Sequence, residues 1–460
     1  MHSRQPKDPP VFPLKFFRWF CHPHFAEDIE GDLLERFDKR QQQKKAAGWL
    51  LTLDVIRLFR PGIIRKFQIS QKLNNFSMFK NYFKLSWRSI MRHKTFSLLN
   101  ILGLSTGLAS CLLIMLYVNN ELSYDKYNSQ YENIYRVVHY YGDESKHSDY
   151  SQLAPDEFQV WGNAPIATAM QDYFPEIEKT FRFTSDAPWL FSYKGLSYSE
   201  NDILFADSTA FQVFDWPFLA GNPETALVKP STIVLTKRLA EKYFGEENPI
   251  GESIIMDNDE PFEVTGVIDV PPNSHFTFAG LVSMSTFRRA RPQVFTSWGY
   301  IDFYTYFVLK PGSQIESMEA KISEFLASKY TYNQDYYIKF EPLSDAYLLS
   351  EAARQPGTTG NMNSIYIFSS IALFILLIAC INFMNLSTAR SVERAKEVAI
   401  RKTIGSHRSS LIYQFLTESV LITFLAALFA GLLVYFGHSL LERLSGKTLV
   451  VDWLFDIRYV

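Results

Sequence analysis

Three long apolar runs divide this chain of 460 residues. They extend from Phe96 to Val118, from Ile365 to Leu386 and from Ser419 to Leu441, and none contains Asp, Glu, Lys or Arg. A helix of about 20 residues crosses the roughly 30 Å of hydrocarbon in a bilayer. The pattern therefore predicts three transmembrane helices, at residues 96–118, 365–386 and 419–441.

The segments in front of the first run have helical spacing. Residues 1–75 are predicted to form a small helical domain in the cytosol, with helices at Pro23–Lys45 and Trp49–Phe59. Residues 76–95 are predicted to form an amphipathic helix in the membrane interface, because apolar side chains and Lys or Arg side chains recur on different faces. Its apolar face holds Phe79, Phe83, Trp87 and Ile90.

Residues 119–364, between the first two runs, mix strand-like and helix-like patterns. This mixture predicts a large inserted α+β domain, in one or two lobes. The strand-like runs are Ile134–Tyr141, Thr232–Thr236, Phe262–Val270, Tyr304–Leu309 and Tyr336–Phe340. The helix-like runs are Lys237–Phe244, closed by Gly245, and Ile315–Ser328. Pro271–His275 is most simply a turn.

Charge is distributed unevenly, although the net charge of the whole chain is only −2. Residues 1–118 sum to +11, residues 119–364 to −16 and residues 365–460 to +3. Because cytoplasmic segments are rich in Lys and Arg, the N-terminus is expected in the cytoplasm and the inserted domain outside it. The only large folded domain is acidic, which argues against nucleic-acid binding.

The segment between the second and third runs, residues 387–418, is basic and is predicted to contain a short helix. On a helical wheel, apolar Val398 and Ala399 fall on one side with Val392, Ala395 and Thr403. Glu393, Arg394, Glu397 and Arg401 fall on the other side, and Glu397 is spaced to pair with Arg401. Gly405 stands where a left-handed residue would end the helix. On charge alone, an ordinary cytoplasmic loop remains an equal alternative.

The wording RSVERAKEVAIRKTIGSHRSSLIYQFLTES resembles the FtsX/MacB-type ABC transporter permeases. In the inserted domain, NELSYDKYNSQYENIYRV and FEVTGVIDVPPNSHF are similar to the periplasmic domain of the same family, and PPVFPLKFFRWFCHPHFAEDIEGDLLERFDKR resembles a permease prefix domain. The resemblance implies that the basic helix is the coupling element that contacts an ATPase. The residues to which it assigns this role are Arg390, Glu393, Arg394, Lys396, Glu397, Val398, Ala399, Arg401, Lys402 and Gly405.

The resemblance also implies an inner-membrane permease subunit for export, efflux or mechanical transmission. A separate cytosolic ATPase would bind ATP and Mg²⁺, whereas this chain would bind no cofactor. The transmembrane unit would be dimeric, in contact with lipid, and would work with a periplasmic adaptor and an outer-membrane channel in an efflux system. Family members carry a fourth helix next, so residues 442–460 are expected to be an extracytoplasmic tail before a missing helix, either because the sequence stops short of it or because the chain is an unusual short form.

Two alternatives belong to other functional classes. An FtsX-like sensor or regulator would transmit a signal across the membrane without transport. A receptor anchored by incidental spans would not explain why the loop between the second and third runs is a capped helix.

Two small-residue pairs are spaced for close helix packing, Gly103 with Gly107 and Ala427 with Gly431.

No motif predicts catalysis in this sequence. Ser445 to Thr448 resembles the end of a phosphate-binding loop, but that loop needs Gly where Leu441 stands. Cys21, Cys111 and Cys380 are too scattered for a metal site or a disulfide framework, as are His139, His147 and His275 for a metal site. The chain itself is therefore not expected to be an enzyme.

Overall fold

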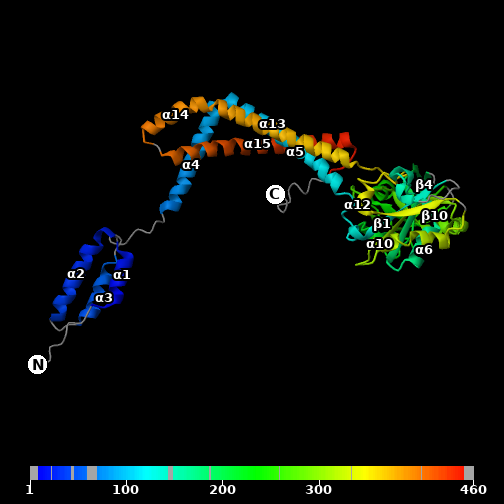
Figure 1. The fold of residues 1–460 in the computed structure, drawn as a ribbon, viewed down its shortest axis with the longest axis horizontal. Coiled ribbons are helices and arrows are strands. Elements are labelled where there is room, and N and C mark those ends of the chain that lie inside the picture. The colour runs from blue at the N-terminus through cyan, green and yellow to red at the C-terminus, as the bar shows by residue number, and fades with distance from the viewer. Residues whose placement is uncertain are drawn as a thin grey trace. The chain divides into compact units, whose positions relative to one another are not determined.

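The structure is a computed structural model that describes residues 9–21, 23–42, 46–59, 70–142, 149–185, 188–257, 260–332, 334–405 and 407–449. The chain separates into two compact units, and each is treated by itself below. The first unit comprises residues 1–99 and 389–425, and the second comprises residues 100–388 and 426–460. Figure 1 identifies the elements by label and colour along the chain.

Three described helices are long and apolar enough to cross a membrane, judged by length and composition. They are α5 (Lys94–Leu122), α13 (Met362–Ala389) and α15 (Arg408–Ser445). Each is longer than the apolar run that predicted it, because polar residues continue the helix at both ends. The difference is largest in α15, which begins eleven residues before Ser419, since neither Gly nor Pro interrupts residues 408–419.

The front of the chain contains one helix more than the pattern predicted. The helices are α1 (Val11–Phe20), α2 (Pro23–Gln42) and α3 (Ala47–Arg57). Aromatic residues of α1 supply much of the shared core: Phe17, Phe20 and Cys21 pack with Leu33, Phe37, Ala47, Leu51 and Val55. The helix α1 was not predicted, because it buries only a narrow face and its aromatic and basic residues alternate without a clear helical period.

Two further helices of the first unit, α4 and α14, adjoin the long helices along the sequence. The helix α4 (Ser70–Arg92) covers the predicted interfacial segment and stops at His93, directly before α5. Phe83 and Trp87 are exposed on α4, together with Lys84 and Arg88, whereas Ile90 of the predicted apolar face is buried, so a position in the membrane interface stays a prediction. The helix α14 (Ser391–Thr403) lies in the basic segment between α13 and α15.

The inserted domain is built on one mixed sheet of thirteen described strands. Their main order is β13-β1-β12-β3-β6-β11-β8-β10-β9-β4-β5, with β2 beside β12 and β7 beside β10. Pairing is antiparallel except for β8 with β10 and β6 with β11. The strands are β1 (Ile134–Tyr141), β2 (Gly162–Asn163), β3 (Ile177–Ser185), β4 (Trp189–Tyr193), β5 (Leu196–Glu200), β6 (Ile203–Ala206), β7 (Phe218–Gly221), β8 (Thr232–Thr236), β9 (Ser253–Met256), β10 (Glu260–Ile268), β11 (Gly280–Ser283), β12 (Ile301–Leu309) and β13 (Tyr336–Pro342).

Short helices cover this sheet and complete its core. They are α6 (Pro165–Tyr173), α7 (Ala210–Val213), α8 (Lys237–Phe244), α9 (Met284–Ala290), α10 (Ile315–Glu319), α11 (Ile322–Lys329) and α12 (Leu343–Ala346). One apolar cluster lies between α6, α11 and the strands around β1, and another lies between α8, α9 and the strands around β8. A third, rich in aromatic residues, contains Trp216, Phe276 and Tyr306.

Local patterns predicted several elements of the domain with the bounds observed. The strands β1 and β8 and the helix α8 begin and end at the predicted residues, and Gly245 follows α8 with a φ of +60°. The predicted helix at Ile315–Ser328 is instead divided between α10 and α11. All described strands join one sheet, so the domain does not contain a separate sheet for each of two lobes.

Candidate coupling sites

The helix α14 presents apolar side chains to solvent. Ile400 is 53% exposed and Ile404, just past the end of the helix, is 80% exposed. Ala399 is exposed beside them, as are Lys396 and Lys402. An apolar strip rimmed by cations is typical of a surface that binds another protein rather than one that only stays soluble. The side chains of Glu393 and Arg394 lie outside the described residues.

The polar side of α14 holds this helix against α15. Arg401 donates to Gln414 of α15 at 2.6 Å and pairs with Glu397 one turn earlier at 2.6 Å. The predicted spacing of Glu397 and Arg401 is therefore realised as an ion pair. Gly405 follows the helix with a φ of +93°, which L side chains rarely adopt, so glycine suits this position. Val398 is half-buried between the two sides.

Arg390, which the sequence placed among the residues of the coupling helix, is buried. Its guanidinium pairs with Glu418 of α15 at 2.9 Å and donates to the hydroxyl of Ser89 in α4 at 3.1 Å. The same hydroxyl donates to Glu418 at 3.1 Å, and the Phe96 ring of α5 lies 5.0 Å from the guanidinium carbon. We call Arg390, Glu418, Ser89 and Phe96 the arginine cluster. It joins the start of α14 to three other helices.

The assignment of Arg390 to the coupling helix stays a prediction, but its burial and its partners were not predicted. A helical wheel describes one isolated helix, whereas Arg390 precedes α14 and faces other helices. One signal in the sequence pointed to the arginine cluster. Glu418 is the only charged residue between positions 409 and 441, and a lone carboxylate in an apolar helix usually has a cationic partner.

Close packing within the second unit involves one of the two predicted small-residue pairs. A methyl group added at Gly107 of α5 would overlap the Cβ of Ala379 in α13, and one added at Gly103 would lie 3.0 Å from the amide nitrogen of Asn382. Gly103 and Gly107 therefore lie where α5 and α13 approach each other closely.

The other pair, Ala427 and Gly431, does not form a helix contact within the described chain. Ala427 is exposed, and a methyl group at Gly431 would meet no atom within 4 Å. The neighbouring face of α15 is buried instead, with Ala426 and Ala430 at 0% and 1% exposure. Ala426 and Ala430 have the same four-residue spacing as Ala427 and Gly431, so spacing alone did not show which pair is buried.

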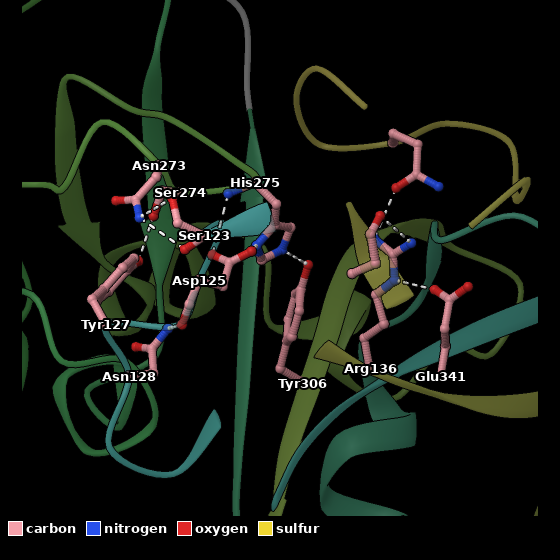
Figure 2. Close-up of polar contacts among 12 residues, drawn as sticks. Ser123, Asp125, Tyr127, Asn128, Arg136, Asn273, Ser274, His275, Tyr306 and Glu341 are labelled. Atoms are coloured by element: carbon pink, nitrogen blue, oxygen red, sulfur yellow. Dashed lines mark hydrogen bonds and ion pairs between the residues drawn. The ribbon is translucent and has the colours of Figure 1, made fainter. Parts of the chain in front are cut away.

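A buried chain of polar groups holds the segment that follows α5 (Figure 2). The imidazole Nδ1 of His275 lies 2.9 Å from a carboxylate oxygen of Asp125, and its Nε2 lies 2.7 Å from the hydroxyl of Tyr306 on β12. All three side chains are at most 4% exposed. We call these residues the histidine clamp. Burial raises the pKa of Tyr306 far above its ordinary value, so the phenol stays protonated.

Backbone contacts reinforce the histidine clamp. Asp125 adopts a φ of +58°, its N–H donates to the carbonyl of Asn273 at 2.8 Å, and the Asn273 amide donates to the carbonyl of Ser123 at 2.8 Å (Figure 2). The N–H of His275 donates to Asp125 at 3.2 Å. Pro271–His275 is therefore more than the simple turn that the sequence indicated, because it binds the chain leaving α5.

A second buried hub fixes the segment that leads into α13. Arg136 of β1 is 1% exposed and donates to Glu341 of β13 at 2.5 Å (Figure 2). The same guanidinium donates to Gln355 and Ser350, both at 2.8 Å. Both ends of the inserted domain are thus tied to its sheet by charged groups.

No described group of three His, Cys, Asp or Glu side chains is arranged to hold a metal ion. His275 belongs to the histidine clamp, and His139 is fully buried on β1, while His147 lies outside the described residues. His139 Nδ1 lies 2.9 Å from the hydroxyl of Tyr336, and its Nε2 has no hydrogen-bond partner. Burial lowers the pKa of His139 to about 3, so this imidazole is neutral.

Comparison with known proteins gives these elements a family. Residues 97–325 match the family described as MacB-like periplasmic core domain. Residues 369–460 match the family described as FtsX-like permease C-terminal. The chain belongs to the FtsX/MacB-type ABC transporter permeases. This membership confirms the FtsX/MacB resemblance and the class of a membrane permease with an α+β periplasmic domain, whereas the prefix domain stays a prediction.

Curated relatives include permeases of this type from several bacteria. The macrolide export ATP-binding/permease protein MacB of Neisseria gonorrhoeae (strain ATCC 700825 / FA 1090) is 25% identical over 401 residues, covering 83% of this chain and 56% of that protein. The uncharacterized ABC transporter permease YknZ of Bacillus subtilis (strain 168) is 26% identical over 243 residues, covering 52% of this chain and 55% of that one. The pyoverdine export ATP-binding/permease protein PvdT of Pseudomonas savastanoi pv. phaseolicola (strain 1448A / Race 6) is 27% identical over 238 residues, covering 49% and 33%.

The chain spans between a third and just over half of the length of these FtsX/MacB-type relatives. Their full activities therefore do not pass to this chain by similarity alone. Two of their names combine ATP binding and permease in one protein, whereas the third names a permease only. The permease part is what this chain shares with them.

Proposed function

We propose that this chain is the transmembrane subunit of an ABC exporter and that α14 receives the movement of a cytosolic ATPase. Two relatives carry the word export in their names, which favours this function over sensing without transport. The observation that carries the proposal is the exposed apolar strip of Ala399, Ile400 and Ile404 on a helix between two membrane-spanning helices.

The arginine cluster makes α14 a suitable receiver. A helix attached only by loops would tilt without moving its neighbours. Here Arg390 connects the start of α14 to α4 and α15 through buried, charge-assisted hydrogen bonds. Farther along, Arg401 binds α15 a second time. Two attachment points on α15 allow a displacement of α14 to move the membrane helix as a unit.

Transmission to the inserted domain would use α5. This helix contributes Phe96 to the arginine cluster, and the chain that leaves its other end enters the histidine clamp at Asp125. An ATP-bound partner that prefers one arrangement of α14 would then shift the population of conformations of the domain. No covalent chemistry in this chain is needed.

The remaining partners follow from this role. ATP and Mg²⁺ would bind to the ATPase, and a dimer of the permease would face lipid with the exposed apolar residues of α13 and α15. The N-terminus and α14 would lie on the cytoplasmic side of a bacterial inner membrane, because both segments are basic. A periplasmic adaptor and an outer-membrane channel would complete an efflux system.

Docking is tested by placing a charge in the apolar strip. Ile404→Asp and Ala399→Asp are each expected to reduce co-purification of the ATPase at least tenfold and to abolish stimulation of its ATP hydrolysis. Ile56→Asp is the matched control, because Ile56 is a similarly exposed isoleucine (56%) on α3. Arg401→Glu is less informative, since it also breaks the contact of α14 with α15.

Retention of the ATPase at full stoichiometry by both strip variants, with normal stimulation, would overturn the docking proposal. Loss of the ATPase in the Ile56→Asp control as well would show a general effect of added charge and would also count against it. Size-exclusion chromatography of each variant confirms that the permease itself remains folded.

A further inference from the structure

Lys447, which follows α15, is enclosed by an acidic and aromatic site in the second unit. Its ammonium lies 2.6 Å from a carboxylate oxygen of Glu121, in the last turn of α5. It also donates to the hydroxyl of Tyr347 at 2.6 Å, and that hydroxyl donates to the other carboxylate oxygen of Glu121 at 2.8 Å. The three groups form a closed triangle in which two ammonium hydrogens and the phenol hydrogen each have an acceptor.

Three aromatic rings surround the same ammonium. The nitrogen lies 5.8, 5.6 and 5.4 Å from the ring centres of Tyr117, Tyr124 and Tyr347. Tyr124 and Tyr347 are stacked, with ring centres 3.5 Å apart. Tyr347 meets the ammonium edge-on, through its hydroxyl, so attraction of the cation to a ring face within about 6 Å can come only from the other two rings. The site therefore combines a carboxylate, a phenol hydroxyl and nearby aromatic rings, which are groups that bind an organic ammonium.

Burial distinguishes this site from an ordinary surface ion pair. Glu121 is 2% exposed and Tyr347 is also 2% exposed, while the side chain of Lys447 is 23% exposed. The carboxylate of the site is therefore kept away from solvent, and the lysine is the most exposed of the three groups. Burial raises the pKa of Tyr347 far above its ordinary value, which keeps its hydroxyl available as a donor.

We propose that Glu121, Tyr117, Tyr124 and Tyr347 form an ammonium-binding cage that the chain fills with its own Lys447, and that this cage accepts a primary alkylammonium ion when the lysine is absent. The cage joins three parts that are far apart in sequence: the end of α5, the segment after α12 and the segment after α15. Lys447 thereby acts as an internal ligand that latches α15 to α5 and to the inserted domain.

The charge of Glu121 explains why the cage requires a cation. A carboxylate that is nearly removed from water is strongly disfavoured without a partner, so withdrawal of Lys447 leaves a site with a high demand for positive charge. In the intact chain, Lys447 is tethered beside the site and competes at a high effective concentration. A free amine therefore binds measurably only when the lysine side chain has been removed.

The backbone at this point suits a reaching lysine rather than a phosphate loop. Gly446 adopts a φ of +66° and its N–H bonds to the carbonyl of Glu442, so the chain turns directly after α15. This turn directs Lys447 to the end of α5. The resemblance of Ser445–Thr448 to a phosphate-binding loop thus reflects a glycine that ends a helix, followed by a lysine with an anionic partner in its own chain.

Chemical rescue tests the cage in the full-length protein purified in detergent. The probe is n-butylammonium, which has the four carbons and the ammonium of a lysine side chain, of which Lys447→Ala keeps only Cβ. We expect Lys447→Ala to lower the thermal midpoint of unfolding and millimolar n-butylammonium to restore at least half of that loss with saturation. Wild-type protein and Arg443→Ala, which removes an exposed cation four residues earlier, should show no saturable shift.

Two further measurements make the result specific. n-Butanol has the same chain without the charge and should not restore the midpoint. The double variant Lys447→Ala with Glu121→Gln should not respond to n-butylammonium, because its cage lacks the carboxylate. If Lys447→Ala cannot be purified, the same comparison is made on the yield of folded protein extracted with and without n-butylammonium.

Equal responses of Lys447→Ala and the double variant, or equal effects of n-butylammonium and n-butanol, would overturn the cage. So would the absence of any rescue in a Lys447→Ala protein that is destabilised. These measurements need no ATPase, and the cage does not rest on transport. A failed cage would therefore leave the docking proposal for α14 intact, and failed docking would leave the cage intact.

Discussion

The two buried ion pairs of the helical region, Arg390 with Glu418 and Lys447 with Glu121, are built on different cations. The planar guanidinium of Arg390 donates to two partners in fixed directions and lies on an aromatic ring. The ammonium of Lys447 sits among three rings at the end of a flexible stem and remains partly exposed. Arginine suits a joint that keeps its geometry, whereas lysine suits a contact that can be released and remade.

Removing the acid of the arginine cluster should have the largest effect. Glu418→Ala leaves the guanidinium of Arg390 buried without its counter-ion, so we expect the free energy of unfolding to fall by about 3–5 kcal/mol. The loss should be visible as a lower thermal midpoint and as aggregation during size-exclusion chromatography.

Glu397→Ala is the matched control, because that glutamate pairs with Arg401 while half exposed. Its expected loss is below about 0.5 kcal/mol. Similar midpoints for Glu418→Ala and Glu397→Ala would show that the arginine cluster is not a structural joint.

The inserted domain should lose stability in acid through a buried histidine, a group that neither of the two ion pairs contains. The folded domain keeps His139 neutral, with a pKa of about 3, whereas unfolded histidine takes up a proton below about pH 6.5. Stability from this residue is complete above pH 6.5 and is lost progressively as the pH falls toward 3. At pH 4.5 the loss should reach about 2–3 kcal/mol.

The check is a thermal midpoint of the full chain between pH 7 and 4.5, monitored by tyrosine and tryptophan fluorescence. His139→Gln should have a lower midpoint at pH 7 but a smaller change with pH. A pH slope that is the same in both proteins would contradict the assignment to His139.

The contact between α5 and α13 offers a test of intermediate size. Gly107→Ala forces a methyl group into Ala379, and we expect a loss of about 1–3 kcal/mol from overpacking. Gly431→Ala is the matched change on α15, where nothing lies within 4 Å. It should be neutral or stabilise the protein by up to about 1 kcal/mol, because alanine favours the helix. Opposite signs in the thermal midpoint are the expected result, and equal losses would contradict the packing.

The smallest predicted effect sharpens the distinction between the two cations. Arg390→Lys keeps the charge opposite Glu418 but loses the forked geometry that also reaches Ser89, so we expect a loss of about 1 kcal/mol. The measurement is the thermal midpoint together with stimulation of the ATPase. An Arg390→Lys protein with unchanged midpoint and full stimulation would show that only the charge of this residue matters.

Several features could be predicted from the sequence because they depend on neighbours along the chain. The apolar runs predicted α5, α13 and α15, and strand-like runs predicted β1 and β8 with the bounds observed. Glu397 and Arg401 lie one turn apart, so their pairing follows from helix geometry, and the φ of Gly405 follows from its place after α14. One of the sequence phrases that resemble the FtsX/MacB-type permeases, RSVERAKEVAIRKTIGSHRSSLIYQFLTES, also contains these residues.

Other features were decided by tertiary structure, because their partners are far apart in sequence. Arg390 meets Ser89, Asp125 meets His275, and Lys447 meets Glu121, across separations that no periodicity spans. Burial also gave two segments contacts that were not predicted: Arg390 joins helices, and the turn at Pro271–His275 binds the chain leaving α5. Sequence alone determined the three long helices and the short helix between the second and third of them, but not α1 or most of the short helices of the inserted domain. Only the fold determined which charges would be removed from water together, and these are the contacts that join the helices.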